Sequence, residues 1–95
     1  MTKQNEEEDL GAVIKGCDMD EELKLDVIST TLDYMNKCFT DQEIASKLKA
    51  KYDEEQKPTW QCIVGRHFGS VVTHEMKNYI YFYIGQMGIV LFKSG

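Results

Sequence analysis

The sequence predicts an α+β domain in which two helices pack on an antiparallel β-sheet. Between Asp18 and Lys57, apolar residues recur at steps of three or four, which is typical of amphipathic helices. After Pro58, short β-branched and aromatic runs alternate instead, which is typical of strands. The length of 95 residues fits one small domain, whose core alone gives little stability. We therefore expect a single domain that gains stability from a partner subunit.

The first residues read as a tail followed by a short strand. Residues 1–11 carry charge without hydrophobic periodicity, so we expect a disordered acidic tail before a domain over residues 12–95. The run "AVIK" at 12–15 is apolar and is followed by Gly16. It predicts an edge strand that ends at this glycine.

The segment "DMDEELKLDVISTTLDYMNKCF" predicts the first helix. We expect Asp18 to be the N-cap, with Glu21 three residues later as its capping-box partner. The expected buried stripe is Leu25, Ile28, Leu32 and Met35.

The segment "TDQEIASKLKAKYDEEQK" predicts the second helix. Thr40 and Glu43 fit a capping box, and Pro58 ends the helix. Its expected buried positions are Ile44, Leu48 and Tyr52.

Four runs predict strands: "TWQCIVG" (59–65), "HFGSVVTH" (67–74), "NYIYFYI" (78–84) and "MGIVLFK" (87–93). The last two are joined by a tight reversal at Gly85 and Gln86. In the third run, the tyrosines at 79, 81 and 83 face one way, and apolar residues at 80, 82 and 84 face the other. Because both faces are apolar, the helices can cover one and a second copy of the chain is expected to cover the other.

Charge and composition argue against several classes of function. The net charge is −5, with −8 over residues 1–56 and +3 over residues 57–95. This acidic balance disfavours nucleic acid as a partner, and the acidic half reads as solvated helix faces. No apolar stretch reaches the roughly 20 residues that a membrane-spanning helix needs.

The three cysteines predict neither disulfides nor a metal site. Cys17, Cys38 and Cys62 are odd in number and widely spaced, and an acidic rather than basic-then-apolar segment precedes them. No pair has the C-x-x-C spacing of a zinc site. We expect a cytosolic protein with reduced thiols.

No catalytic site, cofactor site or metal site is predicted. "HEMKN" at 74–78 lacks the second histidine of H-E-x-x-H and follows a strand pattern. Cys62 and His67 are near in sequence, but Cys62 lies within an apolar strand run and is expected to be an inert thiol. The chain is therefore not expected to be an enzyme.

The stretches "PTWQCIVGRHFGSVVTHE" and "YIYFYIGQMGIVLFKSG", with "AVIK" and "DM" near the start, resemble the small cytoplasmic dynein light chains, the eight-kilodalton class of hub proteins. The resemblance covers residues 12–95. It implies a strand-exchanged homodimer with two grooves, each binding a disordered target segment as an added strand. Targets would carry Thr-Gln-Thr-like motifs, as the dynein intermediate chain does. The resemblance also implies a cytoplasmic location on the microtubule cytoskeleton, within the dynein complex.

The resemblance also assigns site residues. The groove would comprise Lys15, Asp41, Gln42, Phe68, Gly69, Ser70, Val71, Val72, Thr73, His74, Tyr81 and Tyr83. The dimer interface would comprise Gln61, Cys62, Arg66, His67, Phe68, Val71 and Ser94. Residues 68–74 would offer backbone groups to the target. His74 would line the groove and form hydrogen bonds rather than act as a base. Free N–H groups around Asp41 and Gln42 would bind a target glutamine.

Three positions depart from the family pattern. Asp41-Gln42 stands where Glu-Lys is common, Val71 replaces a tyrosine, and Gln61 replaces an interface histidine. Target preference and the pH dependence of the dimer are expected to differ accordingly. The sequence leaves two functions open, because a hub for linear motifs and an inhibitor of a target enzyme would use the same groove.

Overall fold

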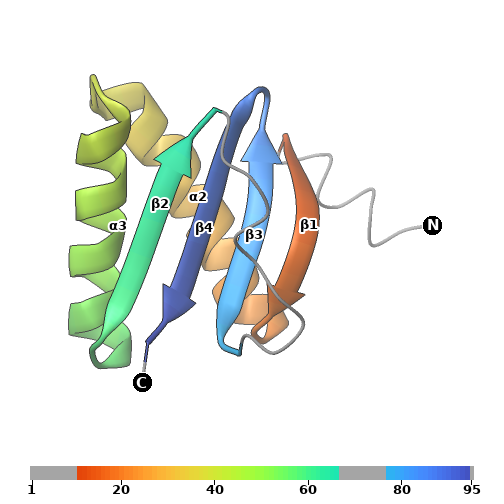
Figure 1. Ribbon diagram of the computed structural model, residues 1–95, viewed down its shortest axis with the longest axis vertical. Helices are drawn as coiled ribbons and strands as arrows, with labels where there is room; N and C mark the ends of the chain where they lie inside the picture. Colours follow the sequence, from red (N-terminus) through yellow and green to blue (C-terminus); the bar gives the residue numbers. More distant parts are fainter. Residues whose placement is uncertain (1–10, 67–76, 95) are drawn as a thin grey trace.

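Two helices cover one face of a four-stranded antiparallel sheet in the computed structural model, which describes residues 11–66 and 77–94 (Figure 1). The elements are β1 (Ala12–Asp18), α2 (Glu21–Lys37), α3 (Asp41–Gln56), β2 (Trp60–Gly65), β3 (Tyr79–Ile84) and β4 (Met87–Lys93). The strand order is β1-β3-β4-β2. The predicted α+β class is confirmed. The strand predicted at 67–74 lies outside the described residues.

Strand β1 is an edge strand, as predicted, but it does not end at Gly16. It continues to Asp18, and its pairing with β3 shifts register between Ile14 and Gly16. A Cβ atom at Gly16 would lie 2.8 Å from the hydroxyl oxygen of Tyr79. Glycine therefore lets the Tyr79 ring lie close to β1 where the pairing shifts.

The expected N-cap of α2 is wrong by two residues. Asp20 is the N-cap, and its carboxylate accepts a hydrogen bond from the Leu23 N–H at 2.8 Å. Asp18 is still in the strand, and its carboxylate accepts from the Asn78 N–H at 2.9 Å. Because β1 runs two residues past the predicted cap, the helix begins at Glu21.

The buried face of α2 is also only partly as expected. Its buried residues are Lys24, Val27, Ile28 and Thr31. Of the predicted stripe, Ile28 is buried, whereas the other three residues are only partly buried. Two polar residues can take core positions because each has a partner. The Thr31 hydroxyl donates to the Val27 carbonyl at 2.8 Å, and the Lys24 ammonium lies 3.3 Å from the Glu21 carboxylate.

The second helix, α3, begins and ends as predicted. The Glu43 N–H donates to the Thr40 hydroxyl at 3.1 Å, and the Thr40 N–H donates to the Glu43 carboxylate at 3.2 Å, which completes the capping box. Its last residue, Gln56, precedes Pro58 by two positions. The three predicted core residues of this helix are buried.

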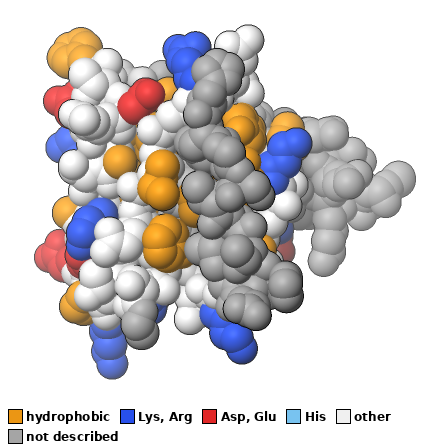
Figure 2. Space-filling model, in the orientation of Figure 1, with side chains coloured by type: hydrophobic (Ala, Val, Ile, Leu, Met, Phe, Trp, Pro, Cys, Tyr) orange, Lys and Arg blue, Asp and Glu red, His pale blue; other side chains and the backbone are white. Residues whose placement is uncertain are grey.

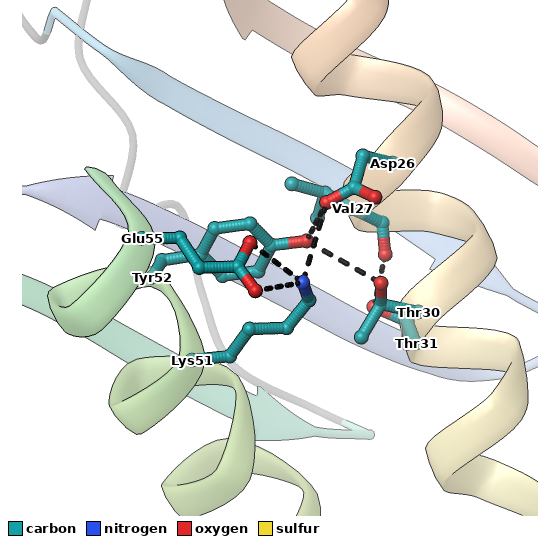
Figure 3. A network of polar contacts seen from close by, with 7 residues as sticks. All are labelled: Asp26, Val27, Thr30, Thr31, Lys51, Tyr52 and Glu55. Carbon is teal, nitrogen blue, oxygen red and sulfur yellow. Dashed lines mark hydrogen bonds and ion pairs between the residues drawn. The ribbon is translucent and has the colours of Figure 1, made fainter.

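A polar network joins the two helices (Figure 3). The Tyr52 hydroxyl donates to the Asp26 carboxylate at 2.7 Å, and the Lys51 ammonium lies 3.8 Å from the same carboxylate and 2.8 Å from that of Glu55. Burial, and then the hydrogen bond with Asp26, raises the pKa of Tyr52 above its usual value. The phenol therefore stays protonated and keeps donating across the helix pair.

The core lies between the helices and one face of the sheet. Its buried residues are Ala12, Val27, Ile28, Ile44, Leu48, Tyr52, Trp60, Ile80, Phe82, Ile89 and Leu91. The Trp60 ring packs against Tyr52, with ring centroids 6.1 Å apart, and the backbone N–H of Trp60 donates to the Asp53 carboxylate at 2.7 Å. This contact fixes β2 beside α3.

Strands β3 and β4 form a hairpin whose connection is Gly85 and Gln86, as predicted. Gly85 has a φ of 63°, which glycine adopts without steric cost, and glycine at the first position of such a turn suits the twist of a hairpin. Among the described helices, none has the length and apolar character needed to cross a bilayer.

Candidate functional site

The face of the sheet turned away from the helices is apolar and aromatic. Residues directly opposed in antiparallel strands lie on the same face, so the register assigns this set. Its members are Val13, Gln61, Ile63, Tyr79, Tyr81, Tyr83, Val90 and Phe92. Val13 and Ile63 are 53% and 38% exposed, and Figure 2 shows hydrophobic side chains gathered on this face. The prediction that both faces of the sheet are apolar is confirmed.

A shallow pocket of about 540 Å³ opens on this outer face beside β1, β3 and the hairpin turn. It is lined by Val13, Lys15, Tyr81, Tyr83 and Gly85. We call it the Lys15 pocket. Three residues that the resemblance assigned to the groove therefore meet at one place.

The Lys15 pocket combines a cation with two phenols. The ammonium of Lys15 lies 5.8 Å from the ring centroid of Tyr83, at a distance where the ring face attracts a cation. The hydroxyls of Tyr81 and Tyr83 are 3.5 Å apart. Their hydrogen bond, and then desolvation, raises the pKa of Tyr81. The phenol of Tyr81 therefore stays protonated. Because one hydroxyl of the pair donates to the other, one O–H of the two can donate to an acceptor, while both rings offer an apolar surface.

The N-terminus of α3 borders a second hollow, of about 460 Å³, lined by Thr40, Gln42, Glu43, Ser46 and Lys47. The capping box uses the N–H of Glu43. The N–H groups of Asp41 and Gln42 stand outside its hydrogen bonds, as N–H groups of a first helical turn do. An acceptor from another chain can therefore reach this helix end without breaking the box. Gln42 lines this hollow and not the Lys15 pocket, so the described residues of one chain do not bring the two parts of the predicted groove together.

Phe39 was not anticipated. A hydrophobic residue before an N-cap commonly packs on the fourth helical residue, here Ile44, which would predict burial. The side chain is instead 95% exposed, while its N–H donates to the Glu43 carboxylate at 2.7 Å. Val13 and Gly85 are likewise pocket residues that the sequence did not single out.

The described interface residues lie on or beside β2 and β4. Gln61 is opposite Phe92 on the outer face. Burial raises the pKa of the Cys62 thiol to about 12, which agrees with an inert thiol. Arg66 is exposed just after β2, and the Ser94 N–H donates to the Thr59 carbonyl at 2.7 Å.

Within the part of the chain that the structure describes, β2 pairs only with β4, so the backbone groups of its other edge have no strand partner. An edge of this kind is a template for another strand. The remaining predicted site residues, His67 and residues 68–74, lie outside the described residues. Nor do the described residues include a group of three or more side chains placed to bind a metal ion.

Comparison with known proteins gives one family and several similar folds. The family model "Dynein light chain type 1" matches residues 11–94. The dynein light chain-like domain of the calcium binding protein FhCaBP2 from Fasciola hepatica superposes with a TM-score of 0.74 at 16% identity, covering 90% of this chain and 93% of that one. The corresponding domain of CsTAL3 gives a TM-score of 0.76 at 14% identity, covering 88% and 93%. At these identities the two structures show a shared fold alone.

Proposed function

Since the chain belongs to the dynein light chain type 1 family, we propose that it is a non-catalytic, homodimeric adaptor that binds short linear motifs for the dynein motor complex. Membership of the family supports a dynein-associated adaptor. The observation that carries the proposal further is the Lys15 pocket, where a cation and two phenols meet on an apolar sheet face.

The dimer is proposed from two features of the sheet. Its outer face exposes apolar side chains, and the described edge of β2 lacks a partner strand. A second copy would supply residues 67–74 to that edge and cover the outer face. Exchange of this kind would bury the apolar outer face and pair the free edge of β2 at the same time.

The proposed groove binds its target mainly through the backbone. Residues 68–74 would pair with an extended target segment, which gives affinity that is tolerant of sequence. The Lys15 pocket would receive target side chains. A target glutamine would accept hydrogen bonds from the N–H groups of Asp41 and Gln42, acting as a cap from another chain.

Two equal grooves in one dimer would hold two target chains side by side. A bivalent partner then gains avidity through effective concentration. The protein would promote dimerisation of partners such as the dynein intermediate chain, in the cytoplasm and on the microtubule cytoskeleton.

Calorimetric titration with a short Thr-Gln-Thr peptide tests the proposal. We expect one peptide per chain, and an affinity at least about tenfold lower for the glutamine-to-alanine peptide, because the helix N–H groups lose their acceptor. Light scattering on the same sample gives the oligomeric state. A monomer that binds no peptide would refute the adaptor; a dimer that binds none would refute the proposed motif.

Because Gln61 cannot be charged, the dimer is expected to lack the acid dissociation that a histidine at this position would cause. A histidine at this position would have to enter the interface neutral, so its pKa would fall on association. Protonation below the free pKa of about 6.5 would then oppose dimerisation, by up to roughly tenfold in the dissociation constant per unit of pKa depression for each of the two histidines in the dimer.

Analytical ultracentrifugation at pH 7.5 and pH 5.5 checks this prediction. Between these pH values, the dimer dissociation constant of Gln61→His should rise by at least about tenfold more than that of the native chain. The variant shares every other titratable group with the native chain, so the comparison isolates position 61. Equal acid dissociation of both proteins would contradict the prediction.

A further inference from the structure

We propose that the chain's own acidic segment, Glu6–Glu7–Glu8–Asp9, binds in the Lys15 pocket and competes there with target peptides. The competition rests on the proposed function, whereas the contact itself rests on the charge and position of the pocket. Charge, reach and donor chemistry each support it.

Charge favours the contact. No carboxylate of the described residues lies within ion-pair distance of Lys15, whose ammonium instead lies over the ring of Tyr83. Among the described residues, none that lines the pocket is acidic. By contrast, Lys24, Lys37, Lys49 and Lys51 are each already paired with a carboxylate. The segment at 6–9 has four carboxylates, and the charged residue among the described lining of the pocket is Lys15.

The segment is tethered at the mouth of the pocket. Ala12 pairs with Ile84, the neighbour of Gly85, and Val13 is itself a lining residue. Asp9 is four residues before Val13 and Glu6 is seven, so an extended chain spans up to about 14 Å and 25 Å respectively. Gly11 has a φ of 81°, which lets the chain change direction immediately before β1. The carboxylates can therefore reach Lys15 without disturbing the strand.

The donors of the pocket suit carboxylates. The Lys15 ammonium and one hydroxyl of the Tyr81–Tyr83 pair can each donate a hydrogen bond to an ionised oxygen, and charge-assisted bonds are the stronger kind. Since the tether is short, the effective concentration of the segment is in the millimolar range. Exposed ion pairs are individually weak and are screened by salt, so the segment should lower target affinity by about three- to tenfold at low ionic strength and hardly at all in high salt.

The test compares three full-length proteins: the native chain, Glu6→Gln/Glu7→Gln/Glu8→Gln, and the control Glu22→Gln/Asp33→Asn/Glu54→Gln. The control removes the same three charges from exposed positions on the helices. The first readout is the NMR signals of the Lys15 side chain and the Tyr83 ring, without peptide, between 25 mM and 500 mM NaCl. We expect them to shift with the tail substitutions and with salt, and not with the control substitutions.

The second readout is calorimetric titration with the Thr-Gln-Thr peptide at both salt concentrations. We expect the tail variant to bind about three- to tenfold more tightly than the native chain at 25 mM NaCl and equally at 500 mM. Unchanged NMR signals would overturn the contact whether or not peptide binds. Shifted signals with equal affinities would overturn the competition. Shifted signals with no peptide binding by any protein would support the contact and refute the proposed function instead.

Discussion

Replacing Phe82 with alanine is expected to reduce the free energy of unfolding by about 3–5 kcal/mol, the range for large-to-alanine changes of buried aromatic residues. Phe82 is fully buried at the centre of β3, opposite Ile89 of β4 and Ile14 of β1. The substitution leaves a cavity in the core that the paired strands β1 and β4 cannot fill. Urea denaturation followed by far-UV circular dichroism measures the loss.

A small domain has about 5–15 kcal/mol of stability in total, so Phe82→Ala is expected to be partly unfolded at 37 °C. Phe82→Leu keeps most of the volume and should lose only about 1–2 kcal/mol, which remains measurable if the alanine variant does not fold. A loss below about 1 kcal/mol for Phe82→Ala would mean that this face of β3 is not the core.

Local patterns in the sequence predict most of this fold. The alternation in 79–84 identifies the buried and outer faces of β3 because strand side chains point to opposite faces in turn. The capping box at Thr40 and Glu43 fixes the start of α3, and Pro58 marks its end. These signals succeed because each depends on chemistry within a few residues.

The wrong predictions concern positions whose structure is not decided by the spacing of apolar residues. Asp18 has the pattern of a helix cap, but β3 holds it in a strand. Lys24 and Thr31 are buried although both are polar, because each finds a partner within one helical turn. Periodicity of apolar residues alone cannot reveal such positions.

The site was predicted through resemblance more than through pattern. Lys15, Tyr81 and Tyr83 are far apart in sequence, and the β1–β3 register places them in one pocket. Val13 is part of that pocket because it is directly opposite Tyr83, which no local signal indicates. The interface and groove residues at 67–74 remain predictions.

Substitution of the adjacent residue on β3, Tyr83, is expected to weaken peptide binding and to leave the fold intact, whereas substitution of Phe82 reduces the free energy of unfolding. Tyr83→Ala is expected to weaken binding of the Thr-Gln-Thr peptide by about 30-fold, corresponding to about 2 kcal/mol for a tyrosine anchor at an interface. The ring contributes to the apolar floor of the Lys15 pocket and lies beneath the Lys15 ammonium, and its hydroxyl pairs with that of Tyr81. Removing the side chain removes part of the apolar pocket surface, the hydroxyl donor and the ring that holds the Lys15 ammonium.

Tyr83→Phe separates these contributions, because it retains the ring and removes only the hydroxyl. It should weaken binding by about fivefold, the value of one neutral hydrogen bond. Calorimetry measures both affinities, and circular dichroism with light scattering shows that fold and oligomeric state are unchanged. Native affinity in Tyr83→Ala would contradict a groove at this pocket. A loss of binding that accompanies a loss of the dimer would assign Tyr83 to the interface between copies, since the outer face of β3 then supports the partner subunit and not the target.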